Sequence, residues 1–150
     1  MKNIPSFMIF LVIVMGAGIS IGTLTIPGDW YASLNKPFFN PPNWIFGPVW
    51  SVLYLFIAYV GWRVWLFDST GVLLPLWILQ MALNFLWSPV FFAAQKPAMA
   101  LFVVLCLLLS IAAFIRAAWH IDRQSAVLFF PYAVWVGFAS ALNASIVYLN

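Results

Sequence analysis

Five long runs of apolar residues constrain the fold of this chain more than any other feature. An α-helix needs about 20 mainly apolar residues to cross the hydrocarbon core of a bilayer, and each run meets that length. The runs are continuous rather than alternating, so a membrane β-barrel is not expected. The sequence therefore predicts a single domain, 1–150, that is an all-α integral membrane protein, a five-transmembrane-helix bundle. The predicted helices cover about 5–26, 44–66, 72–94, 97–119 and 125–149.

The scarcity of charge supports this class. Only 6% of the 150 residues are charged and 66% are hydrophobic, whereas a soluble domain carries about 25% charged residues. Disordered chains are polar and highly charged, so disorder is excluded as well. The net charge of +3 is too small and scattered for a nucleic-acid interface. We expect the lipid bilayer as a partner and no nucleic acid.

Basic residues at the predicted helix ends indicate an orientation. Four lie on the side of the N-terminus and two, Lys36 and Lys96, on the other side, which by the positive-inside rule favours a cytoplasmic N-terminus in a bacterial inner membrane. The first run has a second interpretation, a cleaved signal peptide, although it is longer than a typical signal core and lacks a clean A-x-A site. The four basic residues are Lys2, Arg63, Arg116 and Arg123.

The connection after the first run is much longer than the others. Residues 27–43 read PGDWYASLNKPFFNPPN, with four prolines that restrict the backbone. Its aromatic side chains are too apolar for a solvated, flexible loop. Two interpretations stay open, namely a stiff lid over one end of the bundle and an anchor among the lipid headgroups. The residues predicted for the lid are Trp30, Tyr31, Lys36, Pro37, Pro41 and Pro42.

Three tryptophans lie deeper in the predicted helices than an interfacial belt requires. Trp50, Trp87 and Trp135 fall in the half of the membrane next to the long connection. Asn84 and Asn143 share that half, and carboxamides are costly in hydrocarbon unless they are paired. They either join helices by hydrogen bonds or give polar contacts in an aromatic-walled cavity suited to a flat, apolar ligand. Phe46, Tyr54, Phe91 and Phe92 lie at the same depth.

Other patterns favour packing and anchoring. Gly18 and Gly22 are spaced for close helix contact, and a stripe of small residues in the last helix either packs closely or leaves room for a ligand. The small residues are Ala133, Gly137, Ala141 and Ser145. Five tryptophans near helix ends are expected in the aromatic belt. They are Trp44, Trp62, Trp65, Trp77 and Trp119.

Conventional catalytic groups are missing from the predicted helices. The carboxylates Asp29, Asp68 and Asp122 all fall in connections, and His120 is the single histidine. No acidic pair, nucleophilic triad or multi-histidine metal site can be assembled from these residues. We therefore expect no catalytic residue, no metal and no tightly bound cofactor, and ligand binding is the default function.

Three blocks of sequence resemble the TspO/MBR family of tryptophan-rich sensory and translocator proteins. They stand in the expected order and together span nearly the whole chain. The blocks are WYASLNKP and PPNWIFGPVWSVLY at residues 30–37 and 41–54, NFLWSPVFF at 84–92, and PYAVWVGFASALN at 131–143.

The resemblance implies a five-helix bundle, usually a homodimer, that binds porphyrins such as protoporphyrin IX or a haem-like tetrapyrrole. It implies a receptor or sensor that regulates porphyrin levels or a stress response. The alternatives are light-dependent porphyrin degradation, and porphyrin or sterol transport across the membrane. The C-terminal residues 145–150 lack the basic residue of a sterol-recognition motif. The implied ligand-binding residues are Phe46, Gly47, Trp50, Tyr54, Asn84, Trp87, Phe91, Trp135, Ala139, Leu142 and Asn143.

Overall fold

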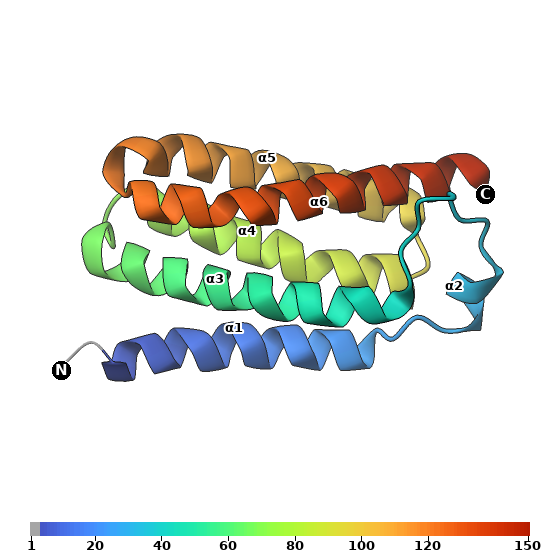
Figure 1. Ribbon diagram of the computed structural model, residues 1–150, viewed down its shortest axis with the longest axis horizontal. Helices are drawn as coiled ribbons and strands as arrows, with labels where there is room; N and C mark the ends of the chain where they lie inside the picture. Colours follow the sequence, from blue (N-terminus) through green and yellow to red (C-terminus); the bar gives the residue numbers. More distant parts are fainter. Residues whose placement is uncertain (1–3) are drawn as a thin grey trace.

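The computed structural model describes residues 4–150, which form a bundle of long helices (Figure 1). Five of its helical stretches are long and apolar enough to cross a membrane, so the predicted all-α bundle is confirmed. Lys2, used above for the orientation, lies outside the described residues. The elements are α1 (Ile4–Leu24), α2 (Asp29–Ser33), η1 (Asn43–Ile45), α3 (Phe46–Phe67), α4 (Leu73–Ser88), η2 (Pro89–Ala93), α5 (Pro97–Ile121) and α6 (Arg123–Leu149).

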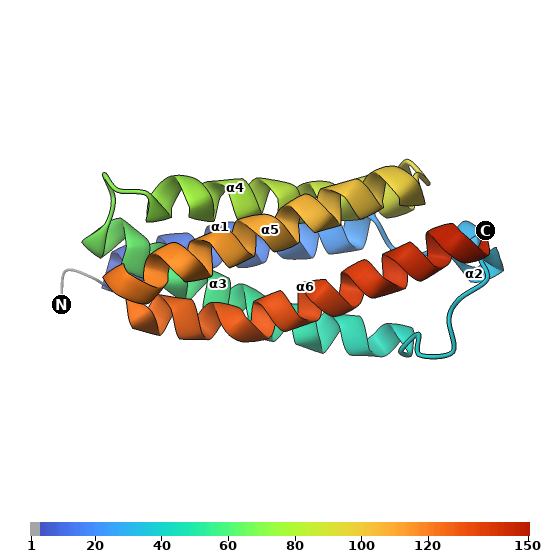
Figure 2. The ribbon, with the colours of Figure 1, turned by 90° about the horizontal axis from the view of Figure 1, so that it is seen from above.

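Neighbouring helices run antiparallel, with the short connections at alternating ends (Figures 1 and 2). The most extensive packing is between α5 and α6, followed by α4 with α5 and α1 with α3. The α5–α6 connection is tighter than the expected break at 120–124, because only Asp122 separates the two helices. The result is a bundle with α1 at one side, packed mainly on α3.

Prolines explain two local features. Pro97 occupies the first turn of α5, where a missing backbone N–H has no helical partner to lose. Pro89 ends the regular part of α4, and the chain continues as the π-helical turn η2, in which the Ala94 N–H donates to the Pro89 carbonyl at 2.9 Å. Such π-turns are often found at functional sites.

The outer surface is apolar, as lipid requires. Large side chains such as Ile9, Val12, Phe102, Leu109 and Val134 are exposed on the outside of the bundle. Inside, aliphatic and aromatic residues fill the core, including the fully buried Phe114, Phe129 and Tyr132. A soluble protein with this surface would aggregate, whereas in a bilayer the same residues contact acyl chains.

One ion pair ties α3 to the α5–α6 turn. The Arg63 guanidinium donates from Nε and Nη2 to the two carboxylate oxygens of Asp122, each at 2.8 Å. Ser125 also donates to this carboxylate. These hydrogen bonds from Arg63 hold the pKa of the Asp122 carboxyl below its ordinary value, against the opposing effect of burial.

The small residues do not all pack as expected. A Cβ on Gly18 would overlap the Tyr54 ring, so α1 and α3 approach closely there, as predicted. Apart from their chain neighbours and the backbone of their own helix, Gly22 and Gly137 have no heavy atom within 4 Å of where a Cβ would lie. The stripe on α6 is therefore not a close helix contact at Gly137. Trp77 was expected in the aromatic belt, but it is buried and donates to the Ile57 carbonyl at 3.0 Å.

We predict that Gly18→Ala destabilises the protein, whereas Gly22→Ala on the same helix does not. The new methyl group at position 18 must displace the Tyr54 ring, and such overpacking costs about 1–3 kcal/mol. Thermal unfolding in detergent measures the difference. Equal unfolding temperatures for the two variants would contradict the close approach of α1 and α3.

A second prediction concerns Asp122. Because folding lowers its pKa, the ion pair stabilises the protein above the unfolded carboxyl pKa of about 3.9, and this stability is lost as the pH falls through the folded-state pKa. Asp122→Asn should lower the free energy of unfolding by about 1.5–3 kcal/mol at neutral pH. It should also flatten the acid limb of a stability–pH curve in detergent, whereas the exposed Asp29→Asn should follow wild type. An unchanged acid limb in Asp122→Asn would refute the assignment.

Candidate ligand-binding site

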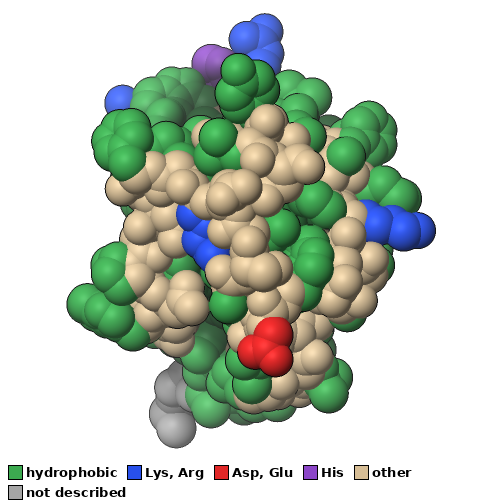
Figure 3. Space-filling model, turned by 90° about the vertical axis from the view of Figure 1, so that its right-hand side faces the viewer, with side chains coloured by type: hydrophobic (Ala, Val, Ile, Leu, Met, Phe, Trp, Pro, Cys, Tyr) green, Lys and Arg blue, Asp and Glu red, His purple; other side chains and the backbone are tan. Residues whose placement is uncertain are grey.

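The connection between α1 and α3 is an ordered strap across one end of the bundle (Figure 1). Its middle is fixed to the end of α6, because the Asn35 N–H donates to Asn150 Oδ1 at 2.9 Å and Asn150 Nδ2 donates to the Asn35 carbonyl at 3.0 Å. Figure 3 looks onto this end, where backbone and apolar side chains prevail and charged groups are few. The strap therefore closes this end with largely uncharged groups.

Lys36 stabilises the strap from within. Its ammonium group donates to the carbonyls of Ala32 and Leu34, both at 3.2 Å, and lies 4.7 Å from the centroid of the Tyr31 ring. Tyr31 is buried and donates to Asn40 Oδ1 at 3.3 Å. Burial raises the pKa of the Tyr31 hydroxyl, partly offset by this hydrogen bond. Tyr31 thus stays neutral.

A cavity of about 640 Å³ lies under this strap. Its volume falls within the range of about 300–1,000 Å³ that is typical of small-molecule sites. It is bounded by α1, the strap, α3, α4 with η2, and α6, but α5 does not reach it. The lining residues on α1 and the strap are Met15, Gly18, Ile19, Ile21, Gly22, Thr23, Thr25, Ile26, Pro27, Tyr31, Asn40 and Asn43. Those on the other elements are Trp44, Phe46, Gly47, Trp50, Ser51, Tyr54, Asn84, Trp87, Ser88, Phe91, Phe92, Ala139, Leu142, Asn143 and Ile146.

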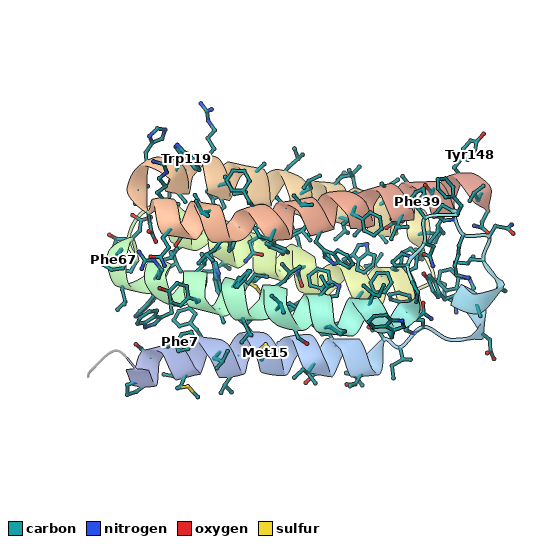
Figure 4. The ribbon with its side chains drawn as sticks, in the orientation of Figure 1. Phe7, Met15, Phe39, Phe67, Trp119 and Tyr148 are labelled. Atoms are coloured by element: carbon teal, nitrogen blue, oxygen red, sulfur yellow. The ribbon has the colours of Figure 1, made fainter. Side chains whose placement is uncertain are left out.

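Aromatic pairs form two walls of the cavity. Trp50 stacks on Tyr54 of the same helix, with ring centroids 5.4 Å apart and an interplanar angle of 29°. Trp87 stacks on Phe91 with the same centroid distance and angle. The ring faces available here suit a flat, apolar molecule, since aromatic groups attract each other in offset-stacked or edge-on arrangements. Figure 4 shows aromatic rings along the bundle, with the labelled Phe39 and Tyr148 at this end.

Asn84 joins the cavity to a buried hydrogen-bond chain. Its Oδ1 accepts from the Tyr54 hydroxyl at 3.1 Å, and its Nδ2 donates to the Tyr132 hydroxyl at 2.8 Å. The Tyr132 hydroxyl in turn donates to Gln80 Oε1 at 2.8 Å, and Gln80 Nε2 donates to the Trp77 carbonyl. Both interpretations of Asn84 therefore meet in one residue, because it bonds between helices and also lines the cavity.

Asn143 has the same double position on α6. Its Oδ1 accepts from the Trp87 indole at 3.1 Å, which fixes that ring in the wall, and its Nδ2 donates to the Pro97 carbonyl at 2.8 Å. A further polar contact joins α1 to α4, where the Thr25 and Ser88 hydroxyls lie 2.6 Å apart. Each of these groups is paired within the protein and still faces the cavity.

The cavity lining carries no formal charge within residues 4–150. No group of three or more His, Cys, Asp or Glu side chains in this part of the chain is placed to hold a metal ion. Among these described residues, the cavity lining offers no carboxylate, imidazole or amine for general acid–base chemistry, and its ionisable side chains are the phenols of Tyr31 and Tyr54. What the cavity can do is stack a flat molecule and orient its polar edge.

The structure brings together most of the residues predicted for ligand binding. Ten of them line the cavity, namely Phe46, Gly47, Trp50, Tyr54, Asn84, Trp87, Phe91, Ala139, Leu142 and Asn143. Trp135 does not, because it packs edge-on against Phe46 at 5.8 Å and forms a second layer behind that ring. Its indole N–H is buried and finds no acceptor among residues 4–150.

Of the lid residues, only Tyr31 reaches the cavity. Trp30 packs edge-on against Phe91 at 5.8 Å and so supports a wall from outside. The remaining residues shape or fasten the strap, because prolines restrict its backbone and the Lys36 side chain bonds to it. These are Lys36, Pro37, Pro41 and Pro42, none of which lines the cavity.

None of the residues predicted for ligand binding lies on α1, although the cavity was expected to border this helix. The second half of this helix forms one side of the cavity, and Ile19 and Ile26 are exposed as well as lining it. Trp44, expected in the aromatic belt, lines the cavity while 73% exposed. These residues mark the mouth, between α1 and the start of α3. The pairing of Gly18 with Gly22 is the only signal in the sequence that could have placed α1 beside open space.

The fold and site define a class: a multi-pass helical membrane protein with a ligand-sized, aromatic-walled cavity at one end. The TspO/MBR family profile matches residues 8–149. The chain is 39% identical over 135 residues to a tryptophan-rich sensory protein of Cereibacter sphaeroides, covering 90% of this chain and 85% of that protein. It is 38% identical over 145 residues to the tryptophan-rich protein TspO of Archaeoglobus fulgidus, covering 95% and 94%. It is 37% identical over 135 residues to the human translocator protein, covering 84% and 79%. The chain belongs to the TspO/MBR family.

We predict that Tyr132→Phe destabilises the bundle. The loss of one hydroxyl leaves Gln80 Oε1 and Asn84 Nδ2 without their partner, and an unsatisfied buried polar group costs about 1–3 kcal/mol. Thermal unfolding in detergent checks this against Tyr148→Phe, whose hydroxyl belongs to a residue 88% exposed. If both variants unfold like wild type, the buried chain contributes nothing to stability.

Proposed function

We propose that the cavity binds a porphyrin-like tetrapyrrole and that the protein is a membrane receptor or sensor for such pigments. The observation that carries the proposal is the uncharged cavity of about 640 Å³ with stacked aromatic walls beneath the strap. A planar conjugated macrocycle that enters the cavity replaces its contacts with lipid or water by contacts with the faces of aromatic rings. Such contacts between aromatic surfaces are favourable.

The distribution of polar groups orients such a ligand. The inner part of the cavity holds amides and hydroxyls that are already paired, and it offers no cation for a carboxylate. A charged carboxylate there would be costly. The propionate groups of protoporphyrin IX therefore point to the mouth, near the exposed Asn43 and Trp44, while the macrocycle lies against Trp50 and Trp87.

Membership of the family supports this proposal at a coarser level. The named relatives are a tryptophan-rich sensory protein and a translocator protein, and a cavity whose mouth lies between α1 and the start of α3 suits a receptor. A homodimer, a bacterial inner membrane and a cytoplasmic N-terminus are further parts of the proposal. No tightly bound cofactor is required by it.

We predict that Trp50→Ala weakens protoporphyrin IX binding about three- to tenfold, because one stacking partner is worth about 0.5–1.5 kcal/mol. Titration of the purified protein in detergent, followed by quenching of tryptophan fluorescence, gives the affinity. Trp65→Ala is the matched control, since Trp65 lies on the same helix but is exposed and does not line the cavity.

Trp135→Phe adds a test of the geometry. Because Trp135 packs behind Phe46 rather than in the wall, we expect its affinity to stay within about twofold of wild type, as is usual for a conservative change outside the contact surface. An equal loss of protoporphyrin IX affinity in Trp50→Ala and Trp65→Ala, or the absence of binding by wild type, would overturn the proposed function.

A further inference from the structure

A second hollow lies at the opposite end of the bundle, where α5 turns into α6. It has a volume of about 300 Å³ and is lined by Ile115, Arg116, Trp119, His120 and Phe130. Figure 4 shows Trp119 at the end away from Phe39 and Tyr148. The span of α5 ends at Ile121 and the span of α6 begins at Arg123, so the turn between them marks one membrane boundary.

Within residues 4–150, the basic side chains at this hollow have no acidic partner. Arg116 and His120 are one helical turn apart on α5, are exposed, and share a face. Across the turn, Arg123 does not itself line the hollow, but its guanidinium lies 4.6 Å from the centroid of the Trp119 ring, which does. The neighbouring carboxylate, Asp122, is occupied by Arg63 and Ser125, and this is the ion pair that the structure shows within residues 4–150.

The position of Arg116 within the membrane-spanning part of α5 indicates what its charge must contact. It lies inside the span of α5, six residues before the turn, which corresponds to about 9 Å along the helix axis. An exposed cation there is costly in hydrocarbon unless its side chain extends to the interface and meets an anion. The anions present at that level of a bilayer are the phosphates of the lipids themselves.

We propose that this hollow binds the headgroup phosphate of an anionic phospholipid in the leaflet next to the α5–α6 turn. Arg116 and Arg123 supply guanidinium groups, which bind phosphate through paired hydrogen bonds. His120 also lines the hollow. Trp119 and Phe130 pack edge-on at 6.1 Å and give an apolar floor for the glycerol and the upper acyl chains. The site is independent of the cavity under the strap.

The test is native mass spectrometry of the purified protein in detergent, titrated with dioleoyl phosphatidylglycerol or dioleoyl phosphatidylcholine. Wild type should retain phosphatidylglycerol preferentially. Each arginine near a lipid surface contributes on the order of a fivefold effect, so Arg116→Gln and Arg123→Gln should each weaken this binding about fivefold and the double variant about 25-fold. Circular dichroism verifies the fold of each variant.

Lys96→Gln is the matched control, because Lys96 is an exposed cation beyond the other end of α5. It should bind phosphatidylglycerol like wild type. Equal retention of the two lipids by wild type, or undiminished selectivity in the double variant, would overturn the proposal. Displacement of phosphatidylglycerol by equimolar inorganic phosphate would also overturn it, since the site would then recognise a free small anion rather than a lipid.

Discussion

The structure depends on the requirement that polar groups in hydrocarbon find partners inside the protein. Helices satisfy their own backbone, and side-chain amides and hydroxyls must be paired by neighbouring helices. The chain from Tyr54 through Asn84 and Tyr132 to Gln80 meets this requirement between α3, α4 and α6. Arg63 and Asp122 do the same for charge at the far end. Polar residues therefore hold this bundle together where water cannot.

The cavity follows from the same constraint. Because Asn84 and Asn143 are already committed to hydrogen bonds between helices, they fix the aromatic walls without presenting unpaired polar groups. Asn143 holds the Trp87 indole, and Asn84 holds the hydroxyl of Tyr54, on whose ring Trp50 stacks. The strap, fastened to the end of α6 through Asn35 and Asn150, keeps the space beneath it from collapsing. A preformed, neutral pocket of this kind favours flat apolar ligands over ions.

Much of the fold was readable from the sequence because apolar length and helix breaks are local signals. The five spans and the family were predicted correctly, as was the close approach at Gly18. The depth of Trp50 and Trp87 and the cost of buried amides pointed to residues that do meet around one cavity. The rest depended on side-chain direction and on which helices touch. Depth alone could not show that Trp135 turns behind Phe46, that Trp77 is buried beside Gly61, or which residues of α1 line the cavity.

The central claim is that the space between α1, α3, α4 and α6 is a ligand site rather than a packing defect. An experimental structure of the protein purified with protoporphyrin IX tests it most directly. We expect density for the macrocycle beneath the strap, in contact with the Trp50 and Trp87 rings. Density for the pigment only on the lipid-facing surface, with side chains filling the space under the strap, would contradict it.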